Sequence, residues 1–267
     1  AVGITASATD ADGTNNTVTY SLTSNPGSLF AIGSSSGIVT LSGALDYETA
    51  SSHTIEVTAT SADTSTSTAS YTIGVTDIDD NVVSAISDTH SGANVLAENA
   101  SSGDAVGITA SATDADGTNN GITYSLSDDD GGNFAIDGST GVVTLTGSLD
   151  YETDTSHAIE VTATSEDAST STASYTIAVT DVDEHDVSSI SDENASAETL
   201  AEDATSGAAV GITALASDAD GTTNGIAYSL SSNPDSLFAI DGSTGVVTLT
   251  GSLDYETDTS HAIEVTA

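Results

Sequence analysis

Acidic residues recur along this chain at one fixed interval. The tetrapeptide LDYE, with a carboxylate on either side of a tyrosine, begins at Leu45 and returns at Leu149 and Leu253, a step of 104 residues. The turn DADGT and the stretch TD(I/V)D return with the same step. Carboxylates, side-chain amides and backbone carbonyls are the oxygen ligands of hard divalent cations, and calcium tolerates irregular geometry better than magnesium. The register of these acids therefore indicates divalent-cation chemistry, with calcium favoured.

The same interval divides the chain into modules. The 267 residues contain two and a half copies of one unit, and self-similarity at a fixed period is typical of arrays. A unit of about 100 residues is the common size of a domain with its own core. We expect three modules: residues 1–80, without a first strand; residues 81–184, complete; and residues 185–267, without a last strand.

Apolar residues within a module alternate with Thr, Ser and Gly. Val106, Ile108 and Ala110 show this pattern, and the runs 122–126, 159–163 and 175–179 repeat it. Side chains alternate across the faces of a strand, so period two predicts strands with one buried face. Turn-rich segments separate the runs, which favours an antiparallel sandwich of about seven strands. The predicted fold class is all-β, with tandem sandwiches in a linear array.

The charge of the chain restricts its partners. It has 41 Asp and Glu residues and no Lys or Arg, which gives a formal net charge of −41. Nucleic acids and anionic membranes are bound through basic residues, so neither is an expected partner, and we expect no membrane insertion. No cysteine is present, which excludes disulfides and thiolate metal sites. A salt-adapted, self-repelling surface would account for scattered acids, but it does not account for acids held in register.

The acids in register should lie at the ends of the modules. In a sandwich, DADG lies between the second and third strands, LDYE follows the fifth, AEN opens the first, and DIDDN forms the linker. Short loops can bring the end of one module, the linker and the start of the next together. Carboxylates that are brought together in this way repel one another. We therefore expect that a cation is needed to keep the ends of the two modules together.

The set AEN, DADG, LDYE and DxDDN resembles the cadherin repeat, in the form found in large secreted or surface-attached bacterial proteins of the adhesin type. The resemblance covers the whole chain. It implies a seven-stranded Greek-key β-sandwich of Ig-like architecture, with calcium bound between successive modules.

The resemblance also implies the calcium ligands. At the first joint these are Asp46, Glu48, Asp77, Asp79, Asp80, Asp114 and Asp116, with the backbone carbonyls of Ile78, Asn81 and Asn119. At the second joint they are Glu98, Asp150, Glu152, Asp181, Asp183, Glu184, Asp218 and Asp220, with the carbonyls of Val182 and His185. Asp10 and Asp12 would face a joint upstream, and Glu202, Asp254 and Glu256 would face one downstream. The carboxylates of the second joint are enough to balance about three divalent ions.

Two departures from the family pattern bear on this ligand set. Ser61 and Ser165 stand where the family has an aspartate, and Asp63 and Asp167 follow two residues later. One calcium ion is therefore either absent or bound through a different residue. The second linker reads DVDEH, with Glu184 in the place of Asp80.

No catalytic constellation is present, and we expect the chain not to be an enzyme. His53, His157 and His261 recur at one strand position, and we interpret them as exposed strand residues rather than metal ligands. The DADGTNN stretch begins like an EF-hand loop but lacks that loop's glycine and its closing glutamate.

The predicted function is a calcium-stiffened extracellular rod or fibre that acts in cell adhesion or in matrix and biofilm structure. Its expected partners are the neighbouring modules, identical chains in a fibre and an unknown surface ligand. Two alternatives stay open. One is a spacer or glycan-binding module of a large secreted enzyme. The other is a self-assembling filament formed by strand complementation.

Overall fold

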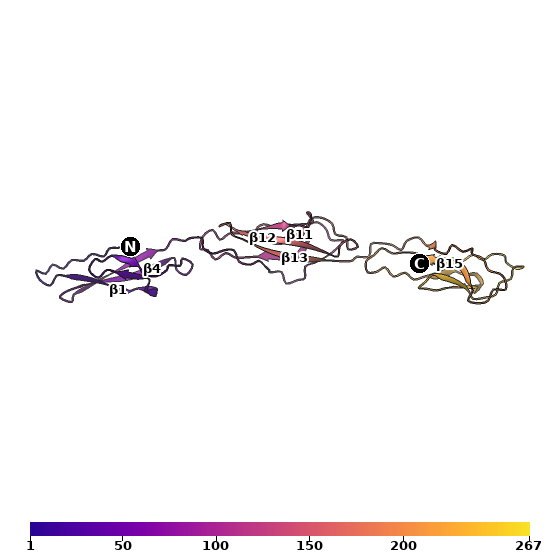
Figure 1. The fold of residues 1–267 in the computed structure, drawn as a ribbon, viewed down its shortest axis with the longest axis horizontal. Helices are drawn as coiled ribbons and strands as arrows, with labels where there is room; N and C mark the ends of the chain where they lie inside the picture. Colours follow the sequence, from indigo (N-terminus) through magenta and orange to yellow (C-terminus); the bar gives the residue numbers. More distant parts are fainter.

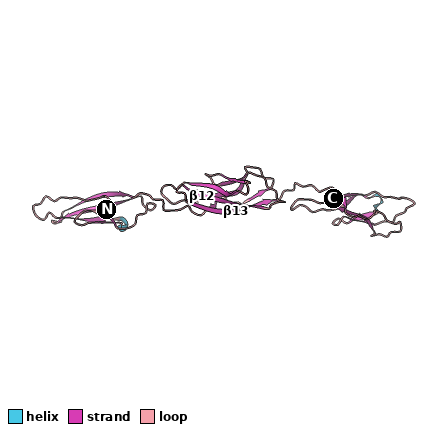
Figure 2. Ribbon diagram, turned by 45° about the horizontal axis from the view of Figure 1, so that its top comes forward, coloured by secondary structure: helices cyan, strands magenta, loops and turns pink.

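Three β-sandwich modules follow one another in a line. The computed structural model describes all residues 1–267, and Figure 1 shows the modules end to end along the long axis. The view in Figure 2, turned by 45°, shows the same line, with loops meeting at each joint. The only helices are the 3-10 turns η1 (Pro26–Ser28) and η2 (Pro234–Ser236). Neither of these three-residue turns approaches the length and hydrophobicity of a membrane-spanning helix.

The middle module is the complete one. Its strands are β6 (Ser87–Asp88), β7 (Val95–Ala97), β8 (Ala105–Ser111), β9 (Ile122–Asp128), β10 (Phe134–Ile136), β11 (Val142–Leu145), β12 (Ser156–Ser165) and β13 (Thr170–Thr180). They form two four-stranded sheets, in the orders β10-β11-β8-β6 and β7-β13-β12-β9. β6 and β7 follow each other in sequence but join opposite sheets, so they are one first strand divided in two. With that division, the predicted seven-stranded sandwich is confirmed.

The outer modules repeat parts of this pattern. The first contains β1 (Val18–Ser24), β2 (Phe30–Ile32), β3 (Val39–Leu41), β4 (Ser52–Ser61) and β5 (Thr66–Gly74). The third contains β14 (Ser191–Asp192), β15 (Ala209–Leu215), β16 (Ser229–Ser232), β17 (Phe238–Ile240), β18 (Val246–Leu249) and β19 (Glu264–Thr266). Their sheets run in the orders β1-β4-β5 and β2-β3 in the first module, and β14-β15-β18-β17 and β16-β19 in the third.

The core lies between the two sheets of each module. Along β8 and β12, the alternating residues Val106, Ile108, Ile159 and Val161 are all at most 2% exposed, while Gly107 and Glu160 between them are only half-buried. The period-two pattern therefore predicted both the strands and their buried faces. Burial of such aliphatic side chains stabilises the sandwich by about 1.5–3 kcal/mol each.

A repeated tyrosine fixes the segment that leads into each DADG turn. The backbone N–H of Ala112 donates a hydrogen bond to the hydroxyl of Tyr124 at 2.9 Å. The pairs Ala8–Tyr20 and Ala216–Tyr228 repeat this contact at 3.0 Å. Each tyrosine thus anchors the end of the second strand just before the acidic turn begins.

The recurring histidines differ from the sequence interpretation. His157 is not an exposed strand residue: only 10% of its side chain is exposed, and its Nδ1 lies 2.7 Å from Asp130 Oδ2. Its ring meets Phe134 edge-on, with centroids 5.8 Å apart. His53 and His261 pack against their own modules' phenylalanines in the same way. These histidines belong to the core edge because their rings pack beside a phenylalanine ring of the same module.

Candidate metal centres at the module joints

At the first joint, Asp116 ties the linker to the middle module. Its side chain is 1% exposed. Its Oδ1 accepts hydrogen bonds from the backbone N–H groups of Asp80 at 3.2 Å and Asn81 at 3.0 Å. Burial raises the pKa of Asp116, but these hydrogen bonds from Asn81 and Asp80 outweigh that effect and the net pKa is lowered. Asp116 is therefore held as an anion.

Three carboxylate oxygens at this joint are buried and accept no hydrogen bond. They are Asp77 Oδ1, Asp114 Oδ2 and Asp116 Oδ2. The second oxygen of Asp77 accepts a hydrogen bond from the Thr118 hydroxyl at 2.6 Å, so the linker is fixed against the DADG turn. A buried anionic oxygen without a partner costs free energy. A cation bound between these oxygens would remove that cost.

The LDYE loop of the first module reaches across the same joint. Glu48 Oε1 accepts a hydrogen bond from the backbone N–H of Gly117 at 3.0 Å. The ring of Tyr47 lies against Gly117 so closely that a Cβ there would overlap it. The tyrosine between the two carboxylates thus packs on the glycine of the next module's DADG turn, and the glutamate binds that turn's backbone.

The second joint repeats this geometry. Asp220 is 1% exposed, and its Oδ1 accepts from the backbone N–H groups of Glu184 at 3.2 Å and His185 at 3.1 Å. Glu152 Oε1 accepts from Gly221 N–H at 2.7 Å, and the Thr222 hydroxyl bonds to Asp181 Oδ2. Asp181 Oδ1 and Asp220 Oδ2 are buried without a hydrogen bond, as at the first joint.

Glu98 adds a buried carboxylate to the second joint. It is 8% exposed, and its oxygens accept from the backbone N–H groups of Tyr151 at 2.7 Å and Val182 at 2.6 Å. It therefore links the first strand, the LDYE loop and the linker. Glu98, Glu152 and Asp181 offer ligand atoms that all lie within 4.8 Å of one another, and Asp181, Glu184 and Asp220 form a second such group.

Crowded charge shifts two pKa values at the second joint. Burial, followed by repulsion from Glu98, Glu152 and Asp220, raises the pKa of Glu184 to about 7. The pKa of Asp183 is also raised, first by the hydrogen bond it shares with Asp220 and then by repulsion from that group. Without a cation, this joint holds more negative charge than its surroundings stabilise.

Asp167 belongs to the first joint, although the sequence-based ligand set omitted it. Ligand atoms of Asp114, Asp116 and Asp167 lie within 4.8 Å of one another. The Ser165 hydroxyl instead donates to the Asn119 carbonyl at 3.2 Å. In the first module, Asp63 joins Asp10 and Asp12 in the equivalent group. The signal was present in the sequence, because both modules carry an aspartate two residues after the serine.

Other predicted ligands occupy turns around the joints. Asp46 accepts from the backbone N–H and hydroxyl of Thr49 at 2.9 and 2.8 Å, and Asp150 and Asp254 make the same contacts with the threonines three residues later.

The remaining predicted ligands lie in the linker and in neighbouring turns. Asp79 accepts from the Asn119 side chain at 3.1 Å, and Asp80 accepts from the Asn81 side chain at 3.2 Å. Glu202 accepts from Tyr255 N–H at 3.2 Å, whereas Asp218 caps its own turn through Asp220 N–H at 3.2 Å. The side chain of Glu256 is exposed.

The donor set fits a hard divalent cation. The groups at both joints consist mainly of carboxylate oxygens, and several of these oxygens are buried without a hydrogen bond. Such sets suit calcium, which takes carboxylate and carbonyl oxygens in flexible geometry.

Comparison with protein families matches the cadherin domain at residues 2–76, 94–180 and 197–267. The chain belongs to the cadherin family. Membership confirms the cadherin-like fold and agrees with the prediction that the chain is not an enzyme, since cadherin repeats are adhesion modules.

This cadherin chain is similar to segments of long animal proteins. Protocadherin Fat 4 of Mus musculus is 42% identical over 139 residues, which are 51% of this chain and 3% of that protein. Cadherin-23 of Homo sapiens is 32% identical over 231 residues, 85% of this chain and 7% of that protein. The crystal structure of mouse cadherin-23 EC22-24 gives a TM-score of 0.70 at 27% identity and covers 95% of this chain and 82% of that chain. These relatives give no support to a bacterial origin.

Proposed function

We propose that this cadherin chain is a segment of a calcium-stiffened extracellular rod that acts in cell adhesion or in extracellular matrix structure. The observation that carries the proposal is the set of buried carboxylate oxygens without hydrogen bonds at both joints, on equivalent residues: Asp77 and Asp116 at the first, Asp181 and Asp220 at the second. Calcium, when bound, supplies the positive charge that offsets their mutual repulsion.

The residues of the chain bring the modules into line. Asp116 and Asp220 hold the linker amides, and Glu48 and Glu152 bind the backbone of the next module. These contacts gather carboxylates from two modules and a linker around one point. Once the charge is balanced, the linker loses its hinge freedom and the array stays extended.

We further propose the ligand set named from the sequence, extended by Asp167 at the first joint and by Asp63 beside Asp10 and Asp12. The module limits 1–80, 81–184 and 185–267 are part of the same proposal. The setting in a large bacterial surface protein stays a prediction, as do biofilm structure, the enzyme-spacer alternative and the strand-complemented filament.

Small-angle scattering of the full 267-residue chain tests the rod. With calcium, we expect a longer and better-defined maximum dimension than with a chelator, because the joints stop bending. Glu152→Gln should reduce the calcium response, since the amide loses the charge that faces Glu98 and Asp181. Glu193→Gln is the matched control, because this exposed side chain lies away from both joints and makes no side-chain hydrogen bond.

The proposal fails if the shape and thermal stability of the wild-type chain are the same with calcium and with chelator. In that case the acids in register form only a salt-adapted surface. A response that is equal in wild type and Glu152→Gln would keep calcium binding but remove Glu152 from the ligand set.

A further inference from the structure

The two joints differ, among other places, at a pair of adjacent linker positions. The first linker carries Asp80 and Asn81, and the second carries Glu184 and His185. The Asn81 side-chain amide donates to Asp116 Oδ1 at 3.1 Å and to Asp80 Oδ1 at 3.2 Å. Its place in the second joint is taken by the imidazole of His185, and here the contact to Asp220 runs through the backbone N–H alone.

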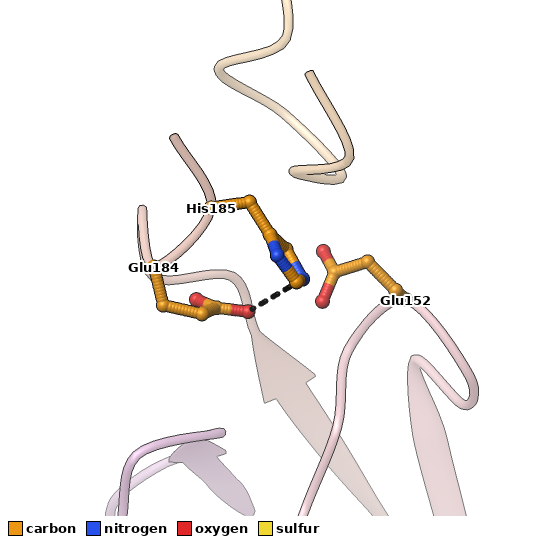
Figure 3. A group of neighbouring side chains, drawn as sticks. All are labelled: Glu152, Glu184 and His185. Carbon is orange, nitrogen blue, oxygen red and sulfur yellow. Dashed lines mark ion pairs between the residues drawn. The ribbon is translucent and has the colours of Figure 1, made fainter. Parts of the chain in front are cut away.

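The imidazole of His185 lies between two glutamates. Figure 3 shows its ring between Glu184 of the linker and Glu152 of the LDYE loop. His185 Nε2 lies 3.8 Å from Glu184 Oε1, and the ligand atoms of all three residues lie within 4.8 Å of one another. The backbone N–H of His185 donates a hydrogen bond to Asp220 at 3.1 Å, which fixes the backbone from which the ring extends. About half of the ring is exposed, at 48%, which leaves it accessible to ions from solvent.

A second observation shows that the carboxylates beside this cluster lack a positively charged partner. Asp220 is 1% exposed, and its Oδ2 accepts no hydrogen bond. Asp181 Oδ1 is also buried without a partner. Both residues group with Glu184, the same carboxylate that faces His185. The chain has no Lys or Arg to meet these oxygens, so a bound cation is the partner that remains.

The donor atoms decide which cation. Imidazole nitrogen is a poor ligand for calcium, which takes oxygen, and a preferred one for zinc, nickel and copper. Zinc is bound by imidazole nitrogen and by carboxylate oxygen, and three protein ligands with a water molecule complete a four-coordinate zinc site. We propose that Glu152, Glu184 and His185 form a binding site for a zinc-class transition-metal ion at the second joint, and that the first joint has no such site.

Such a site would connect the LDYE loop to the linker. Glu152 belongs to the loop before β12, whereas Glu184 and His185 lead into the third module. Because it shares two carboxylates with the proposed calcium joint, the inference rests partly on the proposed function. It goes further in giving one joint of the array a sensitivity to a second metal.

Metal titration of the full chain, with calcium present and with calcium absent, tests the site. Co²⁺ reports its coordination geometry through its visible absorption, and Zn²⁺ affinity is measured by competition with it. His185→Asn, which copies the first linker, should weaken binding at least about tenfold, because loss of even an outer partner of a ligand has that effect. His90→Asn is the matched control, since His90 lies in a turn where its Nδ1 accepts from Gly92 N–H. The double variant Asp80→Glu/Asn81→His should create a second site.

The outcomes separate this inference from the proposed function. Zinc affinity that is equal in wild type and His185→Asn overturns the inference, whatever calcium does to the shape. Zinc binding that needs His185 in a chain whose shape ignores calcium supports the metal site and overturns the calcium rod. Loss of zinc binding in His185→Asn with an intact calcium response supports both.

Discussion

Asp116 is placed to combine a structural role with the proposed role of a metal ligand. Its Oδ1 holds the amides of Asp80 and Asn81, while its Oδ2 is buried without a hydrogen bond. Asp116→Asn keeps an acceptor for the amides but removes the negative charge. We expect the calcium affinity of the first joint to fall at least about tenfold, as measured by calorimetric titration. Glu193→Gln should bind calcium as wild type does, and an unchanged affinity in Asp116→Asn would exclude Asp116 as a ligand.

Asp167 provides a second test at the residue scale. It groups with Asp114 and Asp116, while Ser165 bonds to a backbone carbonyl instead. We expect Asp167→Asn to bind about one calcium ion fewer at the first joint, because its carboxylate contributes charge to that group. Moving the carboxylate back, with Ser165→Asp added to Asp167→Asn, should restore the ion. Glu166→Gln, which changes the adjacent carboxylate outside the group, is the control, and equal stoichiometry in Asp167→Asn and wild type would contradict the assignment.

Glu184 predicts the pH dependence of the cation-free chain. Its pKa is raised from 4.5 to about 7, first by burial and then by neighbouring carboxylates. Between these two values the folded state binds a proton that the unfolded state does not. Stability should therefore fall as pH rises from about 5 to 7.5. The carboxylates with lowered pKa values, such as Asp116 and Asp220, act in the opposite direction but only below pH 3.8.

Thermal unfolding in chelator at pH 5.5 and 7.5 measures this effect. Glu184→Gln should lose a large part of the difference between the two pH values, because it removes the titrating group and leaves the histidines unchanged. Calcium binding near pH 6.5 should release a proton in wild type and less in the variant. A pH profile that Glu184→Gln leaves unchanged would contradict this assignment.

At the scale of the elements, much of the fold follows from the sequence. Val106 and Ile108 occupy every second position of β8. Because alternate side chains of a strand point to opposite faces, this spacing predicted which face of β8 is buried. The division of the first strand into β6 and β7 did not follow, because it depends on pairing with β8 and β13 in opposite sheets. For the same reason the edge-on contact of His157 with Phe134 was missed: β10 and β12 lie in opposite sheets, so packing between the sheets, not local spacing, brings the rings together.

The contact between Tyr47 and Gly117 predicts how tightly two modules pack. A Cβ at Gly117 would overlap the tyrosine ring, whereas nothing lies within 4 Å of one at Gly13, the equivalent glycine of the first module. Gly117→Ala should displace the ring and weaken the contact between the two modules, because overpacking of this kind costs about 1–3 kcal/mol. Gly13→Ala is the matched control. Scattering with calcium should show a shorter or broader particle for Gly117→Ala alone, and identical profiles for the two variants would mean that the ring is not a joint contact.

At the scale of the whole molecule, the chain has a net charge of −41, and histidine is its only basic side chain. Its modules nevertheless lie in one line (Figure 1). Two explanations of the acids predict different responses to salt. Scattered surface charges are relieved by screening, whose range falls from about 10 Å at 0.1 M to about 3 Å at 1 M ionic strength. Carboxylates gathered within 4.8 Å and partly buried are screened far less, and in the proposed rod their repulsion is offset by an ion bound among them.

We therefore expect two separable effects on the full chain. In chelator, raising NaCl to 1 M should increase the melting temperature without lengthening the particle, because screening acts along the whole surface but leaves the linkers free to bend. Millimolar calcium, which hardly changes ionic strength, should raise the melting temperature further and lengthen the particle. Magnesium at equal concentration should do less, since it gives up its water reluctantly and fits irregular oxygen sets poorly. If NaCl alone lengthens the particle as calcium does, general repulsion rather than bound ions sets the shape, and the carboxylates at the joints differ from the others only in position.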